Sequence, residues 1–343
     1  MSYAYHDTQR LKALVARHAD SARWTKEQIT AFAKQNDENA PRMSRVKVAQ
    51  EGHRLKAGGP LGSLHLAAVA RKVPRSEWGK PKAREALDRE WNRLRDMPWP
   101  NGKGKGTWIE SEVKEAWKVR EEAKAEGKKV HFCRICELLY EKHSELDEND
   151  PLRVMKGRDV ILGDNVKDEG FDWAQFDDLG SATPSMEGAR AVLAVSLLPG
   201  YIASQSDAVS AYTQAFLKGT ETWVHLPRER WPAKWIEDGL VNPVVPLKLA
   251  LYGHPDAGTH WENRCKAALR KCGWTCLDYC GWSGLFWHAP KKAMLIVYVD
   301  DFIMAAPKEN QDSLWSDIRK ELNLDAPEDP GRFLGCYLRR FEC

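Results

Sequence analysis

The chain has 343 residues, and a hydrophobic content of 43% excludes a disordered polypeptide and provides enough apolar side chains for a sizeable core. Its 52 lysine and arginine residues nearly balance 49 aspartate and glutamate residues, so a net charge of +3 excludes a strong overall attraction for nucleic acid. The eight cysteines lack the short spacing of a secreted module, and the chain has neither a signal pattern nor an apolar run of membrane-spanning length. We therefore expect a soluble cytoplasmic or nuclear protein with reduced thiols and no membrane partner.

Composition and patterning divide the chain into three regions. Residues 1–75 are polar and basic and are predicted to form a poorly ordered lead-in. The basic side chains of this lead-in could contact nucleic acid, although a solvated surface is the commoner meaning of such a run. Residues 76–150 are predicted to be helical, with amphipathic helices over 85–96 and 111–125. Residues 151–343 carry the predicted strands and the candidate site.

A Cys-x-x-Cys pair, Cys133 and Cys136, lies between His131 and His143 and invites a zinc interpretation. No second Cys or His pair follows at zinc-finger spacing. The neighbouring apolar residues recur at helical spacing, so we interpret both cysteines as part of a helical core rather than as metal ligands.

Two short apolar runs over residues 295–305 surround a pair of adjacent acids, Asp300 and Asp301. Both runs are rich in Val, Ile, Tyr and Phe, and this predicts a strand, a tight turn that carries the acids, and a second strand. Residues 201–207 are predicted to form another strand, which ends on Asp207. The other elements expected in this region are a strand and a helix, over 156–163 and 186–198.

Adjacent carboxylates repel each other, and desolvating them inside a hydrophobic run costs several kcal/mol unless a positive charge lies beside them. A hard divalent cation such as Mg²⁺ takes carboxylate oxygens together with substrate phosphates. Phosphoryl transfer needs acids that hold two such cations a few Å apart. We predict that Asp207, at the end of its strand, joins Asp300 and Asp301 in a site of this kind.

An aromatic residue, Tyr212, follows Asp207 by five positions, where a flat ring can lie under the sugar of a bound nucleotide and leave no room for a 2′-hydroxyl. Each of these residues also has a structural interpretation that is commoner in isolation. Asp207 is a suitable helix N-cap, Tyr212 a suitable core residue, and Asp300 and Asp301 suit an exposed turn. Those separate interpretations do not explain the joint spacing.

The same residues resemble motifs of the reverse transcriptases of copia-type long-terminal-repeat (LTR) retrotransposons, over most of the chain from Trp78 onwards. Four motifs occur in the family's order and spacing, at residues 206–212, 247–253, 298–301 and 332–335. The resemblance implies an α+β fold with the fingers and palm of a right-hand polymerase over residues 151–343. It further implies a ferredoxin-like palm sheet with flanking helices, and a thumb that is largely missing from this sequence.

Carried over to this sequence, the family's motifs imply particular roles. Asp207, Asp300 and Asp301 would be the metal-binding catalytic acids, and Tyr212 the residue that excludes a ribose. Further contacts with the nucleotide or template are implied for a second set of residues, Tyr252, Gly253, Lys156 and Arg158.

The activity implied by the resemblance is RNA-directed DNA polymerisation with two Mg²⁺ ions, or Mn²⁺ in their place. Its partners would be a primed RNA or DNA template and a deoxynucleoside triphosphate (dNTP), with a ribonuclease H domain downstream in the parent polyprotein. The protein would act within a retrotransposon particle. The alternatives are an inactive remnant that keeps the fold and weak nucleic-acid binding, and a palm-fold nucleotidyltransferase of another kind.

Overall fold

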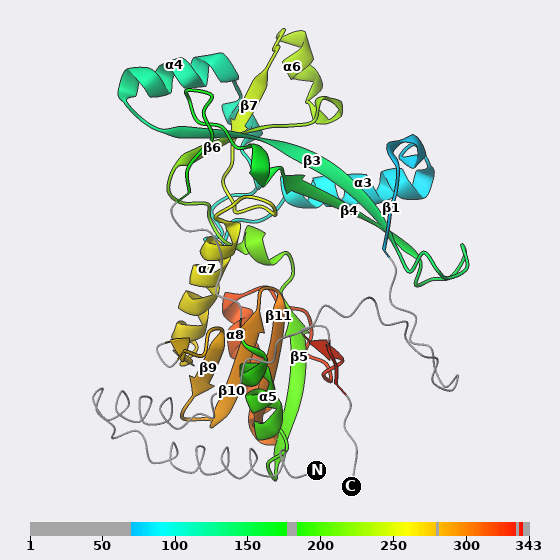
Figure 1. Cartoon of the computed structure of the whole chain (residues 1–343), viewed down its shortest axis with the longest axis vertical. Coiled ribbons are helices and arrows are strands. Elements are labelled where there is room, and N and C mark those ends of the chain that lie inside the picture. Colours follow the sequence, from blue (N-terminus) through cyan, green and yellow to red (C-terminus); the bar gives the residue numbers. More distant parts are fainter. Residues whose placement is uncertain (1–69, 177–183, 279–280, 334–335, 339–343) are drawn as a thin grey trace, which may run out of the picture. The chain divides into compact units, whose positions relative to one another are not determined.

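The structure is a computed structural model that describes residues 70–176, 184–278, 281–333 and 336–338. The lead-in predicted over residues 1–75 therefore lies almost entirely outside the described residues. The described part is an α+β fold with two main sheets, each accompanied by helices (Figure 1). This agrees with the predicted class at the level of α+β.

The larger sheet, called the β3 sheet below, has six strands. Five follow the order β1-β3-β6-β7-β2, and β4 pairs with residues 135–142 of β3, beyond the stretch of β3 that pairs with β6. Strands β3 and β6 run parallel, and the remaining pairs are antiparallel. The strand bounds are Arg71–Lys72 (β1), Lys114–Glu115 (β2), Val130–Lys142 (β3), Val154–Ile161 (β4), Glu221–His225 (β6) and Pro243–Pro246 (β7).

Three helices accompany the β3 sheet: α3 (Pro81–Arg95), α4 (Ala116–Glu126) and α6 (Ala233–Glu237). Helix α3 begins earlier than predicted because Pro81 suits the first helical position, where no backbone N–H is needed. Helix α4 begins later than predicted because the residues before it pair with β7 as β2. It ends at Gly127, whose left-handed φ of 63° forms the expected C-cap.

The helix predicted around Cys133 and Cys136 is wrong, because residues Val130–Lys142 form the long strand β3. The first four residues of β3 are all buried, so the alternation that reveals a strand is hidden at its start. Cys133 is buried and Cys136 is half-buried, and burial raises the pKa of the Cys133 thiol to about 12. A buried neutral thiol at position 133 fits the packing interpretation.

The second sheet, called the hairpin sheet below, is antiparallel, with the order β5-β11-β10-β9-β8. Strand β5 has the bounds predicted from sequence, and β10 and β11 form the predicted hairpin. The strand bounds are Tyr201–Asp207 (β5), Thr275–Cys276 (β8), Leu285–His288 (β9), Ala293–Tyr298 (β10) and Asp301–Pro307 (β11).

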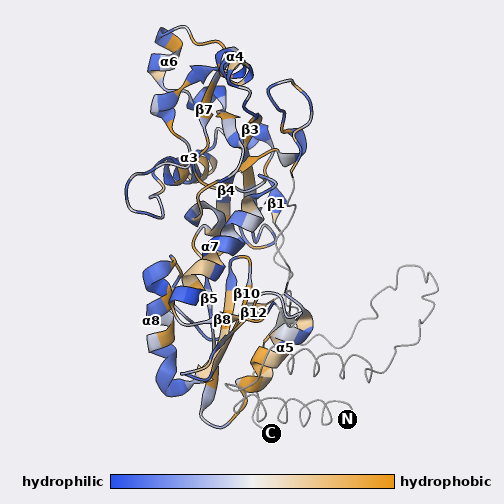
Figure 2. Ribbon diagram, turned by 90° about the vertical axis from the view of Figure 1, so that its left-hand side faces the viewer, coloured by the Kyte–Doolittle hydropathy of each residue, from blue (hydrophilic) through white to orange (hydrophobic). Residues whose placement is uncertain are grey.

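Helices cover both faces of the hairpin sheet. Helix α5 (Met186–Val195), largely orange in Figure 2, contacts β10 and β11, and Ser185 caps it by accepting a hydrogen bond from the Gly188 N–H at 3.1 Å. Helices α7 (Ala257–Lys271) and α8 (Gln311–Glu321) lie against the other face. Their core cluster contains alternate residues of the central strands, including Leu295, Val297, Phe302 and Met304.

The segment after α8 runs antiparallel along the free edge of β5. Gln205 and Glu328 exchange backbone hydrogen bonds of 2.8 Å, and the Asp325 N–H donates to the Asp207 carbonyl at 2.9 Å. Helix α8 also contacts β5, since the Trp315 indole N–H donates a hydrogen bond of 2.7 Å to the Ser204 hydroxyl. In space, the order is therefore this segment, β5, β11 and β10.

The remaining strands, β12 (Arg332–Phe333) and β13 (Cys336–Tyr337), form a two-stranded sheet. Short 3₁₀ helices connect the larger elements at Arg75–Glu77, Glu110–Glu112, Gly163–Asn165, Ala211–Gln214 (η5), Arg228–Arg230 and Lys308–Asn310. Among the described residues, no helix combines the length and apolar character needed to span a membrane.

Candidate functional site

The β10–β11 hairpin turns through Val299 and Asp300, because Tyr298 and Asp301 are the last paired residues of its strands. Val299 has a left-handed φ of 54°. For a β-branched residue, this conformation costs about 1–3 kcal/mol and persists only where the surroundings enforce it. The two-residue hairpin turn requires a positive φ at its first position. Two hydrogen bonds of 2.7 Å reinforce it, from the Trp261 indole N–H to the Val299 carbonyl and from the Ala208 N–H to the Asp300 carbonyl.

Asp207 lies directly opposite Asp301 on the neighbouring strand. The hydrogen bond from Ala208 to Asp300 makes the next position along, Asp207 and Asp301, a pair without mutual backbone hydrogen bonds. The side chains of such a pair point to the same face, and the Cα atoms are about 4.5 Å apart. Two acids that are distant in the sequence are thus neighbours, with Asp300 adjacent in the turn.

The acids are close enough for their charges to raise the pKa values of Asp207 and Asp301. Burial and the negative charges of the other two raise the pKa of Asp301 to about 6. Burial and Asp300 also raise the pKa of Asp207, opposed by a hydrogen bond from Gln205. Within the described part of the chain, none of the three acids has an ion-pair partner; the salt bridges lie elsewhere.

The donor chemistry of this end of the sheet suits a hard divalent cation, which prefers carboxylate and carbonyl oxygens and neutralises mutually repelling acids. Among the described residues, however, no group of three or more His, Cys, Asp or Glu side chains is arranged to hold a metal ion. A cation here would therefore need oxygen atoms from the main chain, from water or from a substrate in addition to the carboxylates.

Tyr212 and Tyr252 also lie at this end of the hairpin sheet. Their rings form an edge-to-face pair with centroids 4.6 Å apart. Burial raises the pKa of both phenols, and the charge of Asp300 adds to the shift in each case. The structure thus brings both predicted tyrosines close to the acidic turn, Tyr212 from the 3₁₀ helix η5 and Tyr252 from the segment before α7.

Arg158, on β4, approaches Tyr252 from the β3 sheet, and Lys156 lies two residues before it on the same strand. The Arg158 guanidinium is 5.5 Å from the centre of the Tyr252 ring and 3.7 Å from the Glu90 carboxylate. Burial, followed by the nearby charges of Arg158 and Lys142, lowers the pKa of Lys156 to about 8. Two neighbouring cations that repel each other would be stabilised by an anion between them.

Gly253 has a packing requirement that sequence reasoning missed. Its φ is 86°, and a Cβ atom added there would lie 2.0 Å from the Ile161 carbonyl oxygen of β4. A Cβ atom on Gly163 would lie 2.1 Å from the Gly253 carbonyl oxygen, so the two glycines let the backbones touch. The Ile161 N–H donates to the Tyr252 carbonyl at 2.7 Å across this contact. Close backbone approach is sufficient to explain this glycine.

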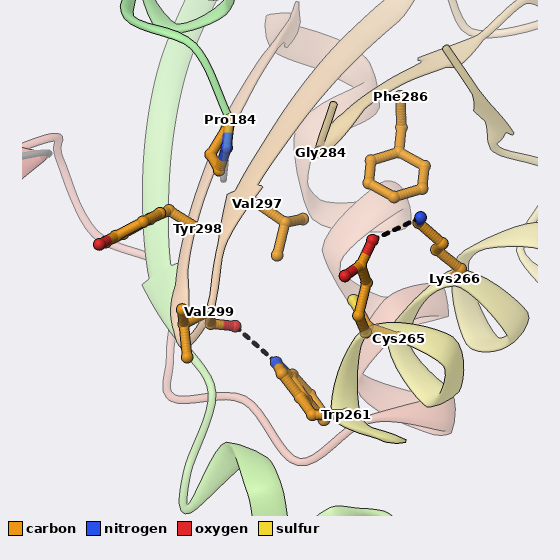
Figure 3. Close-up of a pocket in the computed structure, with 10 residues that line it drawn as sticks. Pro184, Trp261, Cys265, Lys266, Gly284, Phe286, Val297, Tyr298 and Val299 are labelled. Atoms are coloured by element: carbon orange, nitrogen blue, oxygen red, sulfur yellow. Dashed lines mark hydrogen bonds and ion pairs between the residues drawn. The ribbon is translucent and has the colours of Figure 1, made fainter. Parts of the chain in front are cut away.

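A cavity of about 160 Å³ adjoins the turn, between α7 and the end of β10 (Figure 3). Its wall includes Trp261, Cys265, Phe286, Val297 and Val299. The contact of Trp261 with the turn was not predicted, because its helical spacing with Cys265 marks only a core position. Of the predicted 332–335 motif, residues 334 and 335 lie outside the described residues.

The chain matches no protein-family model and no curated protein. Its function must therefore be inferred from the arrangement of its own side chains.

Proposed function

We propose that the chain is the fingers and palm of a copia-type reverse transcriptase and catalyses RNA-directed DNA synthesis. One observation carries the proposal: Asp207 lies opposite Asp301 on adjacent strands, with Asp300 in the intervening turn and no cation paired with any of them among the described residues. Acids kept together at such a position are characteristic of sites that receive a cation with their substrate.

The topology of the hairpin sheet supports the assignment to a palm. Its elements follow one another as β5, α7, the β10–β11 hairpin, α8 and the edge segment beside β5. This is a β-α-β-β-α-β order with the last segment next to the first strand, which is the ferredoxin-like arrangement. The β3 sheet would then correspond to the fingers, with Lys156 and Arg158 on β4 facing the dNTP phosphates.

In this proposal Asp207, Asp300 and Asp301 would hold two Mg²⁺ ions. When bound, the ions supply neutralisation of the triphosphate charge and a lower pKa for the attacking primer 3′-hydroxyl. The chain's own residues bind and orient the substrates. The Tyr212 ring, which packs edge-to-face on Tyr252, would exclude a ribose 2′-hydroxyl, and Arg158 and Lys156 would offer positive charge to the phosphates.

Primer extension by the full chain tests the proposal. We expect incorporation of dNTPs on a primed RNA template with Mg²⁺ or Mn²⁺, and a loss of at least about a hundredfold in Asp300→Asn. The matched control is Asp312→Asn, an exposed acid on α8, which should keep full activity. Extension that survives Asp300→Asn would refute the site.

Metal binding supplies a readout that does not need polymerisation. Mn²⁺ titration followed by electron paramagnetic resonance should detect binding to the wild-type chain and much weaker binding to Asp300→Asn. The alternative is an inactive remnant that keeps the fold. It predicts neither incorporation nor acid-dependent Mn²⁺ binding, together with salt-sensitive nucleic-acid binding that is the same in both variants.

A further inference from the structure

Helix α7 reaches the hairpin turn through one side chain. Trp261 is only 2% exposed, and its indole N–H donates to the Val299 carbonyl at 2.7 Å, as the dashed line in Figure 3 marks. Helix α7 also contacts η5, the 3₁₀ helix that carries Tyr212. Trp261 therefore links the element behind the sheet to the turn that presents Asp300.

The Val299 carbonyl needs such a restraint because the residue is held in an unfavourable conformation. A valine at φ 54° gains stability by returning toward the extended region, and that rotation would reorient the following residue, Asp300. The hydrogen bond from Ala208 fixes only the carbonyl of Asp300. The bond from Trp261 fixes the peptide group that precedes Asp300.

Packing gives limited help on this side of the turn. The pocket of about 160 Å³, which is partly open to solvent, lies between Trp261, Val297 and Val299, so part of the turn does not face close-packed side chains. Solvent restrains its neighbours less than close-packed side chains do. The position of the turn consequently depends on the single indole N–H more than it would in a filled core.

We propose that Trp261 is a positioning residue, which orients the Asp300 carboxylate by holding the Val299 carbonyl. The effect on catalysis rests on the proposed function, whereas the effect on the turn does not. Replacing the indole by a phenyl ring retains an aromatic group but removes the N–H donor, so Trp261→Phe isolates the hydrogen bond.

The chain offers a matched control in Trp274, which belongs to the same core cluster and is also 2% exposed. Its indole N–H has no hydrogen-bond partner in the described part of the chain. Trp274→Phe therefore makes the same change in side-chain volume without removing a hydrogen bond, and Trp261→Phe should lose more thermal stability because only it leaves a carbonyl unpaired.

Hydrogen exchange of the Ala208 amide measures the turn directly, because this amide donates to the Asp300 carbonyl. We expect exchange about tenfold faster in Trp261→Phe and unchanged in Trp274→Phe. In primer extension, Trp261→Phe should lower kcat about tenfold and raise the Mg²⁺ concentration for half-maximal activity, with the KM for primer-template unchanged.

Equal exchange rates at Ala208 in the two variants would overturn the positioning role. So would a parallel loss of kcat in both variants, since that result would reduce Trp261 to a core residue. If the wild-type chain does not polymerise, the proposed function fails, and faster exchange in Trp261→Phe alone would still establish that Trp261 holds the turn.

Discussion

The β3 sheet and the hairpin sheet treat acidic side chains in opposite ways. In the β3 sheet, Glu137 accepts two hydrogen bonds from Arg230, of 2.6 and 2.9 Å, and both side chains are only 9% exposed. In the hairpin sheet, Asp207 and Asp301 face each other and, among the described residues, have no ion-pair partner. An acid that serves packing is neutralised within the fold, whereas an acid that serves binding is left for a ligand to neutralise.

Removing the cation from the β3 sheet should have the largest effect on stability. Arg230 also pairs with Asp88 at 2.5 Å, but Asp88 is 40% exposed and has a second partner in Arg84. Arg230→Met would therefore chiefly leave the buried Glu137 unpaired. We expect a loss of about 3–5 kcal/mol in the free energy of unfolding, measured with urea. The control is Lys80→Met, which breaks an exposed pair with Glu77 and should change stability by less than about 1 kcal/mol. Equal small losses would contradict the contrast between the sheets.

Asp159 is a buried acid of the β3 sheet that, among the described residues, lacks the neutralising partner found for Glu137. Its effect on stability should therefore depend on pH. It is 1% exposed, its Oδ2 lacks a hydrogen-bond partner in the described part, and burial followed by the charges of Glu137 and Glu90 raises its pKa to about 8. Because the folded pKa exceeds the unfolded value of about 3.9, its contribution to stability falls as pH rises from about 4 to about 8.

Asp159→Asn imitates the protonated acid and tests this directly. The variant should be more stable than the wild type by about 1–3 kcal/mol at pH 9, with the difference vanishing near pH 4. Thermal denaturation across this pH range measures it. A variant that is less stable than the wild type at every pH would show that the ionised carboxylate is required.

The smallest effect on stability is expected for Asp301→Asn, a substitution within the candidate site that should abolish activity. Asp301→Asn removes a charge whose folded pKa is about 6, above its unfolded value, so the benefit is complete above pH 6 and absent below about pH 4. After allowance for partial solvent screening, we expect a gain of about 1 kcal/mol at pH 8 together with loss of primer extension. If the variant were less stable than the wild type and still extended a primer, Asp301 would serve the packing of the fold rather than catalysis.

The parts of the fold that the sequence predicted well are those with an unambiguous local pattern. Strand β5 ends on Asp207 as expected. The β10–β11 turn lies one residue before the predicted pair of acids, because Val299 and Asp300 form it and Asp301 is the first residue of β11. The sequence predicts a helix in place of strand β3 because its pairing partners, β4 and β6, are remote in the sequence, and because side chains of helices α3 and α4 pack against its buried residues. Local periodicity carries no information about such partners.

The candidate site shows the same limit. The proximity of Asp207 to Asp300 and Asp301 followed from the spacing of motifs, but nothing local indicated that Trp261 would hold the Val299 carbonyl. Nor did the sequence indicate that Arg158 would lie over Tyr252, because this contact joins residues of different sheets and depends on tertiary packing.

The backbone contact between Gly163 and Gly253 has a mechanical consequence. Because the two chains touch without intervening side chains, the end of β4 and the segment that carries Tyr252 cannot slide past each other without separating first. The backbone hydrogen bond from Ile161 to Tyr252 and the edge contact between the Tyr252 and Tyr212 rings extend this contact. The strand that bears Lys156 and Arg158 is thus joined to the tyrosines beside the acids by direct contacts.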